Sequence, residues 1–201
     1  MNIILDKLPK SVEIDNKVYR FSTDFRTSIL FELAMFDDEL SEEEKVIQAL
    51  QLYFDDNIPY NKEEAIKAIK WFYSCGKKAE EQSKKSTNSN DRQKNIFNYE
   101  YDAEYIYSAF MHDYKIDLNK IRYLHWWKFK ALFNGLNEDN KLIKIMGYRS
   151  IDLRKISDKD EKQRYRELQK LYALPQPKED KQKLEEINNI LLNGGDLSRI
   201  L

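Results

Sequence analysis

The sequence predicts a mainly α-helical protein, a helical bundle with one short β-hairpin near its N-terminus. Only five of the 201 residues are Gly and four are Pro, whereas an all-β sandwich or barrel needs turn residues at almost every strand end. Apolar residues recur every three or four positions over most of the chain, as they do on the buried face of a helix. The 10 Phe, 13 Tyr and 3 Trp supply enough surface for a core, although 34% of the residues are charged.

The first expected element is the hairpin, which we expect to be the only sheet. Apolar and polar residues alternate over residues 12–14 and 18–21, on either side of the turn sequence Asp15-Asn16-Lys17. A helix is expected next, with Ser22 as its N-cap, because a serine hydroxyl there accepts a hydrogen bond from the first turn. The apolar residues of this helix are Phe25, Ile29, Leu33 and Phe36.

Two more helices are expected before residue 77. Ser41 and Glu44 have the spacing of a capping box, in which each side chain bonds the backbone N–H of the other residue. Asn61 and Glu64 repeat this start signal. Gly76 is expected to end the third helix, because glycine readily adopts the left-handed conformation found just after helix ends.

A polar segment then divides the chain. Residues 77–95 contain a single small apolar residue and cannot bury a hydrophobic face, so they predict a flexible charged linker. The predicted organisation is a hairpin with three helices over residues 1–76, the linker over 77–95 and a C-terminal helical lobe over 96–201. A linker that binds a partner as a charged arm is the alternative interpretation.

Five helices are expected after the linker. Their predicted extents are residues 105–114 capped by Asp102, 118–134 ended by Gly135, 138–146 ended by Gly147, a helix from Ser157 or Asp158 to before Pro175 and Pro177, and one around 184–191. The fourth carries Tyr165, Leu168, Leu171 and Tyr172 at the spacing of a core face. The last shows one apolar stripe, which either packs on the body or docks on a partner.

The predicted helix over residues 118–134 is apolar on every side, so it should be buried on every side. It is either the central helix of its lobe or has one face covered by another chain. We expect Leu124 and Trp127 to face the intrachain core. A second apolar face, which we name as the candidate partner-binding surface, contains Trp126, Phe129 and Phe133.

The chemistry of a metal, nucleotide or catalytic site is missing from the sequence. The two histidines, His112 and His125, have no ligand partner at helical spacing, and Cys75 is the only cysteine. No glycine-rich phosphate loop is present. We therefore expect no enzyme activity, cofactor or metal, with His125 as a hydrogen-bonded core residue. No apolar stretch is long enough for a signal peptide or membrane span, which favours a cytoplasmic protein.

Charge gives two contrasting hints about partners. The 34 Lys and Arg nearly balance the 35 Asp and Glu, which excludes a strongly basic nucleic-acid binder. Residues 1–60 carry 6 basic and 13 acidic side chains, whereas residues 61–201 carry 28 and 22. This asymmetry suits head-to-tail self-association or an oppositely charged partner, or is a chance partition of solvated surface. Residues 126–130 interleave aromatic and basic side chains as in nucleic-acid platforms, but burial is the favoured interpretation.

Two stretches resemble a known family. The residues are Tyr123-Leu124-His125-Trp126-Trp127-Lys128-Phe129 with Ala131-Leu132-Phe133, and Lys144-Ile145-Met146-Gly147-Tyr148-Arg149 with Ile151-Asp152-Leu153. They resemble the bacteriophage gene-product-fifteen family, small proteins of long-tailed phages and prophages of Gram-positive bacteria whose genes lie beside the tape-measure gene. The resemblance covers most of the chain and brings no catalytic residues with it.

The resemblance implies a tail-assembly chaperone that binds the helical tape-measure protein during tail-tube assembly. Expected partners are the tape-measure protein, a second copy of the chain and a neighbouring tail chaperone, with no membrane. The expected location is the host cytoplasm, with the protein absent from the mature virion. The alternatives are a nucleic-acid-binding phage regulator and a minor structural tail protein.

Overall fold

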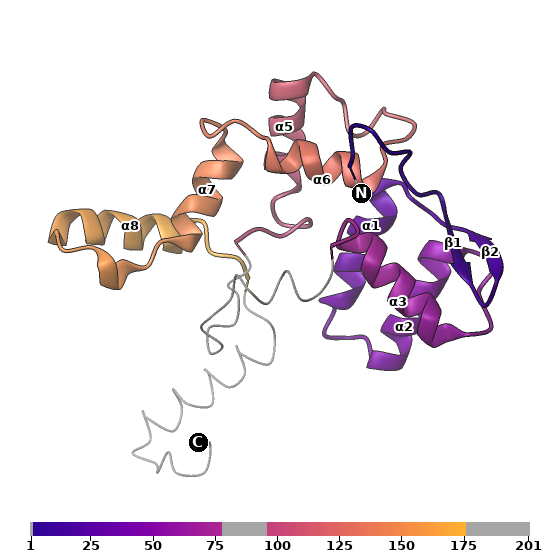
Figure 1. The fold of residues 1–201 in the computed structure, drawn as a ribbon. Helices are drawn as coiled ribbons and strands as arrows, with labels where there is room; N and C mark the ends of the chain where they lie inside the picture. The colour runs from indigo at the N-terminus through magenta and orange to yellow at the C-terminus, as the bar shows by residue number, and fades with distance from the viewer. Residues whose placement is uncertain (1, 78–95, 176–201) are drawn as a thin grey trace, which may run out of the picture.

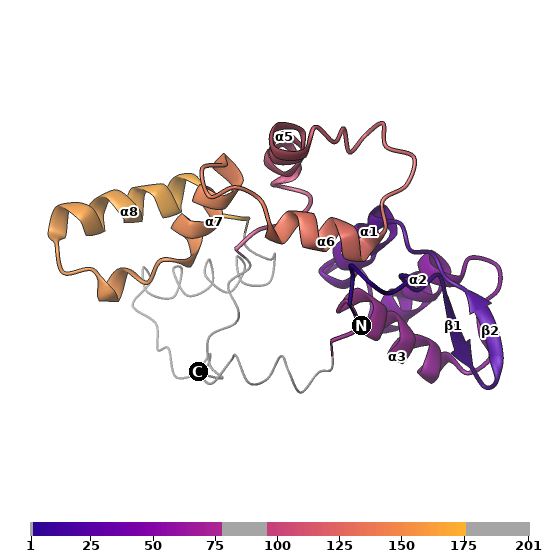
Figure 2. The ribbon, with the colours of Figure 1, turned by 45° about the horizontal axis from the view of Figure 1, so that its top comes forward.

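The computed structural model describes residues 2–77 and 96–175, and within them it confirms the predicted fold class. Seven α-helices and one two-stranded antiparallel sheet make up the described chain (Figures 1 and 2). The elements are β1 (Ser11–Ile14), β2 (Lys17–Arg20), α1 (Phe25–Met35), α2 (Glu42–Phe54), α3 (Lys62–Tyr73), α5 (Ala103–Tyr114), α6 (Trp126–Asn134), α7 (Lys141–Ser150), a 3₁₀ turn at Leu153–Lys155 and α8 (Lys159–Leu171).

The hairpin forms where the sequence predicts it. Ser11 pairs with Arg20 and Ile14 with Lys17, which leaves Asp15 and Asn16 as the two turn residues. Both have positive φ, 51° and 60°. This is the geometry of the tight turn that matches the twist of the flanking strands, and Asn and Asp tolerate it better than other residues with a side chain.

Local capping sets the starts of the first three helices. Asp24, rather than the predicted Ser22, caps α1 by accepting a hydrogen bond from Arg26 N at 3.1 Å. Ser22 does not cap the helix, because its hydroxyl bonds the Thr27 hydroxyl and its backbone N–H donates to Tyr53 O. The predicted capping box at Ser41 and the predicted cap at Asn61 are both confirmed.

Two indole groups join the C-terminal end of α3 to the start of α6. Trp126 Nε1 donates to Tyr73 O and Trp127 Nε1 donates to Phe72 O, each at 2.8 Å. The two carbonyls lie at the end of α3, where the helical ladder runs out, and Phe72 O also accepts from Cys75 N at 3.0 Å. Gly76 has φ +74°, and a Cβ there would lie 2.9 Å from the Trp127 ring, so the turn after α3 needs glycine for both reasons.

The predicted helix over residues 118–134 is half right, because α6 begins only at Trp126. His125 is its N-cap, with the ring Nδ1 accepting from Trp127 N at 3.1 Å. The preceding segment is held by groups distant in sequence. Phe25 N donates to Leu124 O and Trp126 N donates to Thr23 O, forming a short antiparallel bridge, while Arg26 Nη2 donates to Leu118 O and Ile121 O. Over residues 118–125 these long-range hydrogen bonds take the place of helical ones.

A single hydrophobic core runs through both sides of the predicted linker. Buried residues from the hairpin, α1–α3, α5, α6 and the start of α7 form one cluster. The packing therefore does not separate residues before 77 from those after 96. We call the described chain up to Met146 the body; the predicted linker beyond residue 77 and the predicted helix around 184–191 lie outside the described residues.

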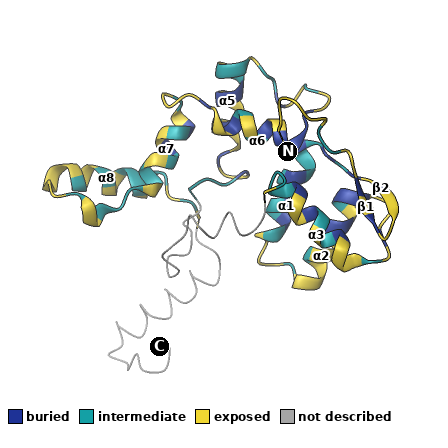
Figure 3. Cartoon of the chain, viewed as in Figure 1, coloured by how far each residue is buried: buried dark blue, intermediate teal, exposed yellow. Residues whose placement is uncertain are grey.

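Residues 147–175, which we call the arm, differ from the body. Helix α7 runs through Gly147, the predicted end, to Ser150, and Asp158 caps α8 as predicted. However, α8 contains no buried residue, so the prediction that Tyr165, Leu168, Leu171 and Tyr172 form a core face is wrong (Figure 3). Figures 1 and 2 both place α8 beside α7, at the end of the molecule opposite the hairpin.

A buried ion pair fastens the arm to the body. Arg149 Nη1 and Nη2 donate to the two carboxylate oxygens of Asp102 at 2.6 and 2.9 Å, and the two side chains are 10% and 1% exposed. The same guanidinium donates to Ile96 O and Tyr172 O. Asp102 is at the N-cap of α5, as predicted, but its side chain makes no cap bond because it pairs with Arg149.

Candidate partner-binding groove

The side chains first named as the partner-binding surface lie inside the protein. Trp126 and Phe129 are fully buried and Phe133 is 4% exposed, so they are not available to another chain. The expectation that Leu124 and Trp127 face the intrachain core is confirmed, since both are buried. The helix does have two apolar faces, and this chain covers both.

The second cover is the segment that precedes α5. Tyr99 and Phe97 pack on Phe133, while Phe110 of α5 stacks on Phe129 with a ring separation of 5.0 Å. Phe25 of α1 stacks on Phe129 at 4.9 Å. The aromatic residues of α6 therefore form part of the core, and they cannot serve as an exposed stacking platform for nucleic acid.

The two residues considered for chemistry have structural environments. His125 is buried, and its Nε2–H donates to Pro9 O at 3.0 Å while Nδ1 accepts from Trp127 N, as expected of a core histidine. Burial lowers the pKa of His125 and raises the pKa of the Cys75 thiol. Neither change activates a nucleophile. In the described residues no group of three or more His, Cys, Asp or Glu could hold a metal.

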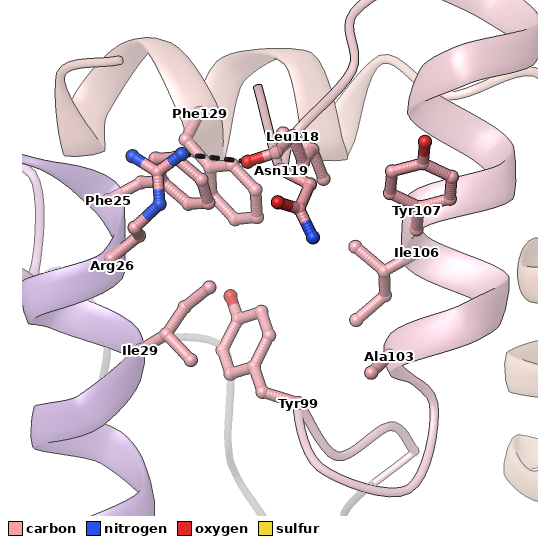
Figure 4. Close-up of a pocket in the computed structure, with 10 residues that line it drawn as sticks. All are labelled: Phe25, Arg26, Ile29, Tyr99, Ala103, Ile106, Tyr107, Leu118, Asn119 and Phe129. Atoms are coloured by element: carbon pink, nitrogen blue, oxygen red, sulfur yellow. Dashed lines mark hydrogen bonds between the residues drawn. The ribbon is translucent and has the colours of Figure 1, made fainter. Parts of the chain in front are cut away.

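A groove lies between α1 and α5, with Phe129 of α6 at its base (Figure 4). The residues from α1 are Phe25, Arg26 and Ile29, and those from α5 are Ala103, Ile106 and Tyr107. Tyr99 enters from the segment before α5, and Leu118 and Asn119 come from the loop that follows it. The cavity volume is about 370 Å³.

Hydrogen bonds hold the walls of the groove. Arg26 Nη1 donates to Asp24 Oδ1, and Nη2 donates to Leu118 O and Ile121 O at 2.8 Å, so this one side chain ties α1 to the loop above α5. Asp117 bonds the backbone N–H groups of Asn119 and Lys120 and stiffens the same loop. The groove is thus largely formed without a ligand, as binding sites usually are.

Tyr99 is the unusual residue of the groove. Its side chain is 6% exposed, and its buried hydroxyl has no hydrogen-bond partner among the described residues. Figure 4 shows the hydroxyl directed into the space between Ile29 and Ile106. An unsatisfied buried hydroxyl costs about 1–3 kcal/mol. Burial raises the pKa of Tyr99, so the group stays protonated and can donate.

The lining selects against several ligand classes. Arg26 is the one charged lining residue, and its guanidinium is already bonded to a carboxylate and two carbonyls. A phosphate or a metal ion would find no free charge there. The remaining surface is apolar apart from Tyr99, Tyr107 and Asn119. The groove therefore suits an apolar side chain or two from a partner, together with one hydrogen-bond acceptor.

The sequence did not single out this groove. Its residues come from three separate stretches, 25–29, 99–107 and 118–129, and only the fold brings them together. The one available signal was the pair of aromatic residues Phe97 and Tyr99 just after the polar segment, of which Tyr99 is buried and Phe97 partly buried.

The comparison with protein families gives a clear result. The family model described as Bacteriophage Gp15 protein matches residues 4–174. The chain belongs to this family. The match spans the body and the arm of this Gp15-family protein, confirms the resemblance seen at residues 123–133 and 144–153, and makes the protein phage-associated. Comparison with curated proteins and with solved structures gave no match. No described helix is long and apolar enough to cross a membrane.

Proposed function

We propose that this Gp15-family protein is a phage tail-assembly chaperone that binds helical segments of the tape-measure protein. The observation that carries the proposal is the preformed apolar groove between α1 and α5, which Tyr99 helps to line. On this proposal the protein acts in the host cytoplasm, does not catalyse a reaction and leaves before the virion is complete.

A groove between two helices suits a third helix. A tape-measure protein is a long and largely helical chain, and its apolar stripes need cover before the tail tube encloses them. An amphipathic helix inserts side chains spaced by three or four residues into such a groove. Ile29 and Ile106 stand on opposite walls and would contact both sides of an inserted side chain.

Tyr99 adds selectivity to this fit. An apolar segment alone would leave the hydroxyl without a partner, whereas a segment carrying a hydrogen-bond acceptor beside its apolar residue would satisfy it once the buried Tyr99 side chain turns toward the groove. The preferred segments are therefore helices in which Asn, Gln, Ser or Thr neighbours the inserted Leu, Ile or Met. Such a requirement lets one groove accept many tape-measure segments while rejecting uniformly apolar chains.

Two groove variants and one neighbour test the proposal. Ile29→Glu places a charge in the groove and should weaken binding of purified tape-measure fragments by about tenfold or more. Tyr99→Phe removes one hydrogen bond and should weaken binding by about 5- to 10-fold, without loss of stability. Leu30→Glu is the matched control, because Leu30 lies next to Ile29 on α1 but is 52% exposed and outside the groove.

Binding is measured by isothermal titration calorimetry, with urea unfolding of each variant. Equal affinities for Ile29→Glu, Leu30→Glu and the unmodified protein would contradict the groove as the site. Absence of binding by the unmodified protein to every tape-measure fragment would contradict the chaperone role itself.

A further inference from the structure

An acidic surface lies where α1 ends and α2 begins. We call residues 36–47 the acidic corner. It contains six exposed carboxylates and one basic side chain; the carboxylates are Asp37, Asp38, Glu39, Glu42, Glu43 and Glu44. Three apolar side chains are exposed among them, Phe36 at 58%, Val46 at 40% and Ile47 at 51%. Exposed apolar side chains with a polar rim are a feature of interaction surfaces.

The arm carries a surface of opposite charge. Lys159, Lys162, Arg166 and Lys170 fall on one face of α8, within about 80° when residues are placed at 100° steps. Among the described residues, none of the four forms an ion pair. We call them the basic stripe. Leu171, which follows Lys170 in the chain and lies about 100° around the helix from it, is 71% exposed.

We infer that the basic stripe of one copy docks on the acidic corner of the next, so that the protein assembles head to tail. The two surfaces carry opposite net charges, and large apolar side chains are exposed on the corner and near the stripe. Figures 1 and 2 place α8 and α2 at opposite sides of the molecule. A contact between two different surfaces is heterologous, so each bound copy leaves one of each surface free for another copy.

The acidic corner of a second copy matches the charge of the basic stripe better than residues 176–201 of the same chain do. Residues 176–201 carry four basic and five acidic side chains, so they bring almost no net charge to the basic stripe. The acidic corner brings a net charge of −5 over residues 36–47. Because the charges on both surfaces are exposed, the attraction should weaken strongly as salt is raised, since screening shortens its range to a few ångströms at high ionic strength.

Head-to-tail assembly goes beyond the proposed groove and does not depend on it. None of the residues of the acidic corner or the basic stripe lines the groove between α1 and α5. A row of copies would present one groove per copy along an extended helical partner, which raises the overall affinity without any new contact in a groove.

Two double variants of the full-length protein test the inference by sedimentation velocity at about 50 mM salt. The corner variant is Asp38→Lys with Glu43→Lys, and the stripe variant is Lys159→Glu with Arg166→Glu. Neither changes a capping residue. The unmodified protein should form larger species as its concentration rises, and each variant alone should stay monomeric. A control with the same charge change outside the corner, Glu13→Lys with Asp56→Lys, should still assemble.

The decisive sample is the mixture of the two variants. The corner variant keeps its stripe and the stripe variant keeps its corner, so the mixture should form a one-to-one dimer that does not grow further. A mixture that stays monomeric, or single variants that assemble like the unmodified protein, would overturn the inference. A monomeric unmodified protein whose unfolding midpoint falls in the stripe variant would overturn it as well, because the stripe would then stabilise its own chain rather than a contact between copies.

Discussion

Helices α6 and α8 both carry apolar side chains at helical spacing, but only those of α6 are buried. In α6, Trp126, Trp127, Phe129 and Phe133 are buried, whereas α8 has no buried residue although Tyr165, Leu168 and Tyr172 share one side of it. The difference lies in the neighbours. Helix α6 is covered from two sides by α1 and by residues 97–110, while the main contacts of α8 with described elements are with α7 and the 3₁₀ turn at Leu153–Lys155. An apolar stripe therefore predicts that a helix face should be buried, but it does not predict whether the same chain or another molecule buries it.

Polar contacts widen the contrast between body and arm. The body positions its aromatic rings with buried hydrogen bonds, such as those from the two indole groups of α6 to α3. Within the arm, Gln169 Nε2 donates to Tyr148 O and Ile151 O, and Arg149 donates to Tyr172 O. The bonds from Arg149 to Asp102 and Ile96 O join the arm to the body. The direction of the arm is thus set by few bonds, and none of the residues of α8 is buried by the described part of the chain.

The sharpest way to break this comparison is to cut one apolar side chain from each helix. Phe129→Ala should destabilise the protein by about 4 kcal/mol, because the ring is fully buried among Phe25, Phe110 and Trp126. Leu168→Ala should cost less than about 1 kcal/mol, because a partly exposed side chain loses little burial. Urea unfolding measures both. Similar losses for the two would mean that α8 is part of the core.

The sequence predicted those features that a few neighbouring residues decide. The hairpin turn and the caps at Ser41, Asn61 and Asp158 each depend on residues within four positions. The start of α6 was missed because Arg26, some 90 residues away, takes the carbonyls that a helix over 118–125 would use. Gly147 did not stop α7, since it lies in open space and a helix tolerates glycine at a modest cost.

The groove was beyond sequence reasoning for a related reason. Apolar periodicity predicted a helix buried on all sides, but Lys128, Ala131 and Asn134 of α6 are exposed, and periodicity could not tell an intrachain cover from a partner. The assignment of Trp126, Phe129 and Phe133 to a partner failed on that point. The burial of the Tyr99 hydroxyl depends on the packing of α1, α5 and α6, so no local sequence pattern could predict it.

A second variant tests the junction between body and arm. Asp102→Asn keeps the shape of the side chain but leaves the buried guanidinium of Arg149 without its counter-charge. Removing one partner of a buried pair is strongly destabilising, and we expect a loss of about 3 kcal/mol. The arm should also detach first, which hydrogen exchange at α8 amides would detect as lost protection below the unfolding midpoint. Asp152→Asn is the control, because Asp152 pairs with Arg154 at the surface.

The smallest expected effect is the pH dependence of stability that comes from His125, a buried titrating group of the body. Burial lowers the folded-state pKa of His125 below its unfolded value of about 6.5. Below that value the unfolded chain takes up a proton that the folded chain resists, so stability falls as pH drops through 6.5. The loss between pH 7.5 and 5.5 should be at most about 1.4 kcal/mol.

His125→Asn should remove this pH dependence, and the reason follows from its two hydrogen bonds. Asn is a good N-cap residue and can accept from Trp127 N in place of the ring Nδ1, so α6 should still begin at Trp126 at a constant cost. Glu32 acts with the opposite sign, because burial raises its pKa and stability then increases as pH falls, and it is unchanged in the variant. The variant should therefore be equally or slightly more stable at pH 5.5 than at 7.5 in urea unfolding. His112→Asn, at a side chain 76% exposed, should retain the loss seen in the unmodified protein. If His125→Asn lost as much stability on acidification as the unmodified protein, the acid sensitivity would come from groups other than His125.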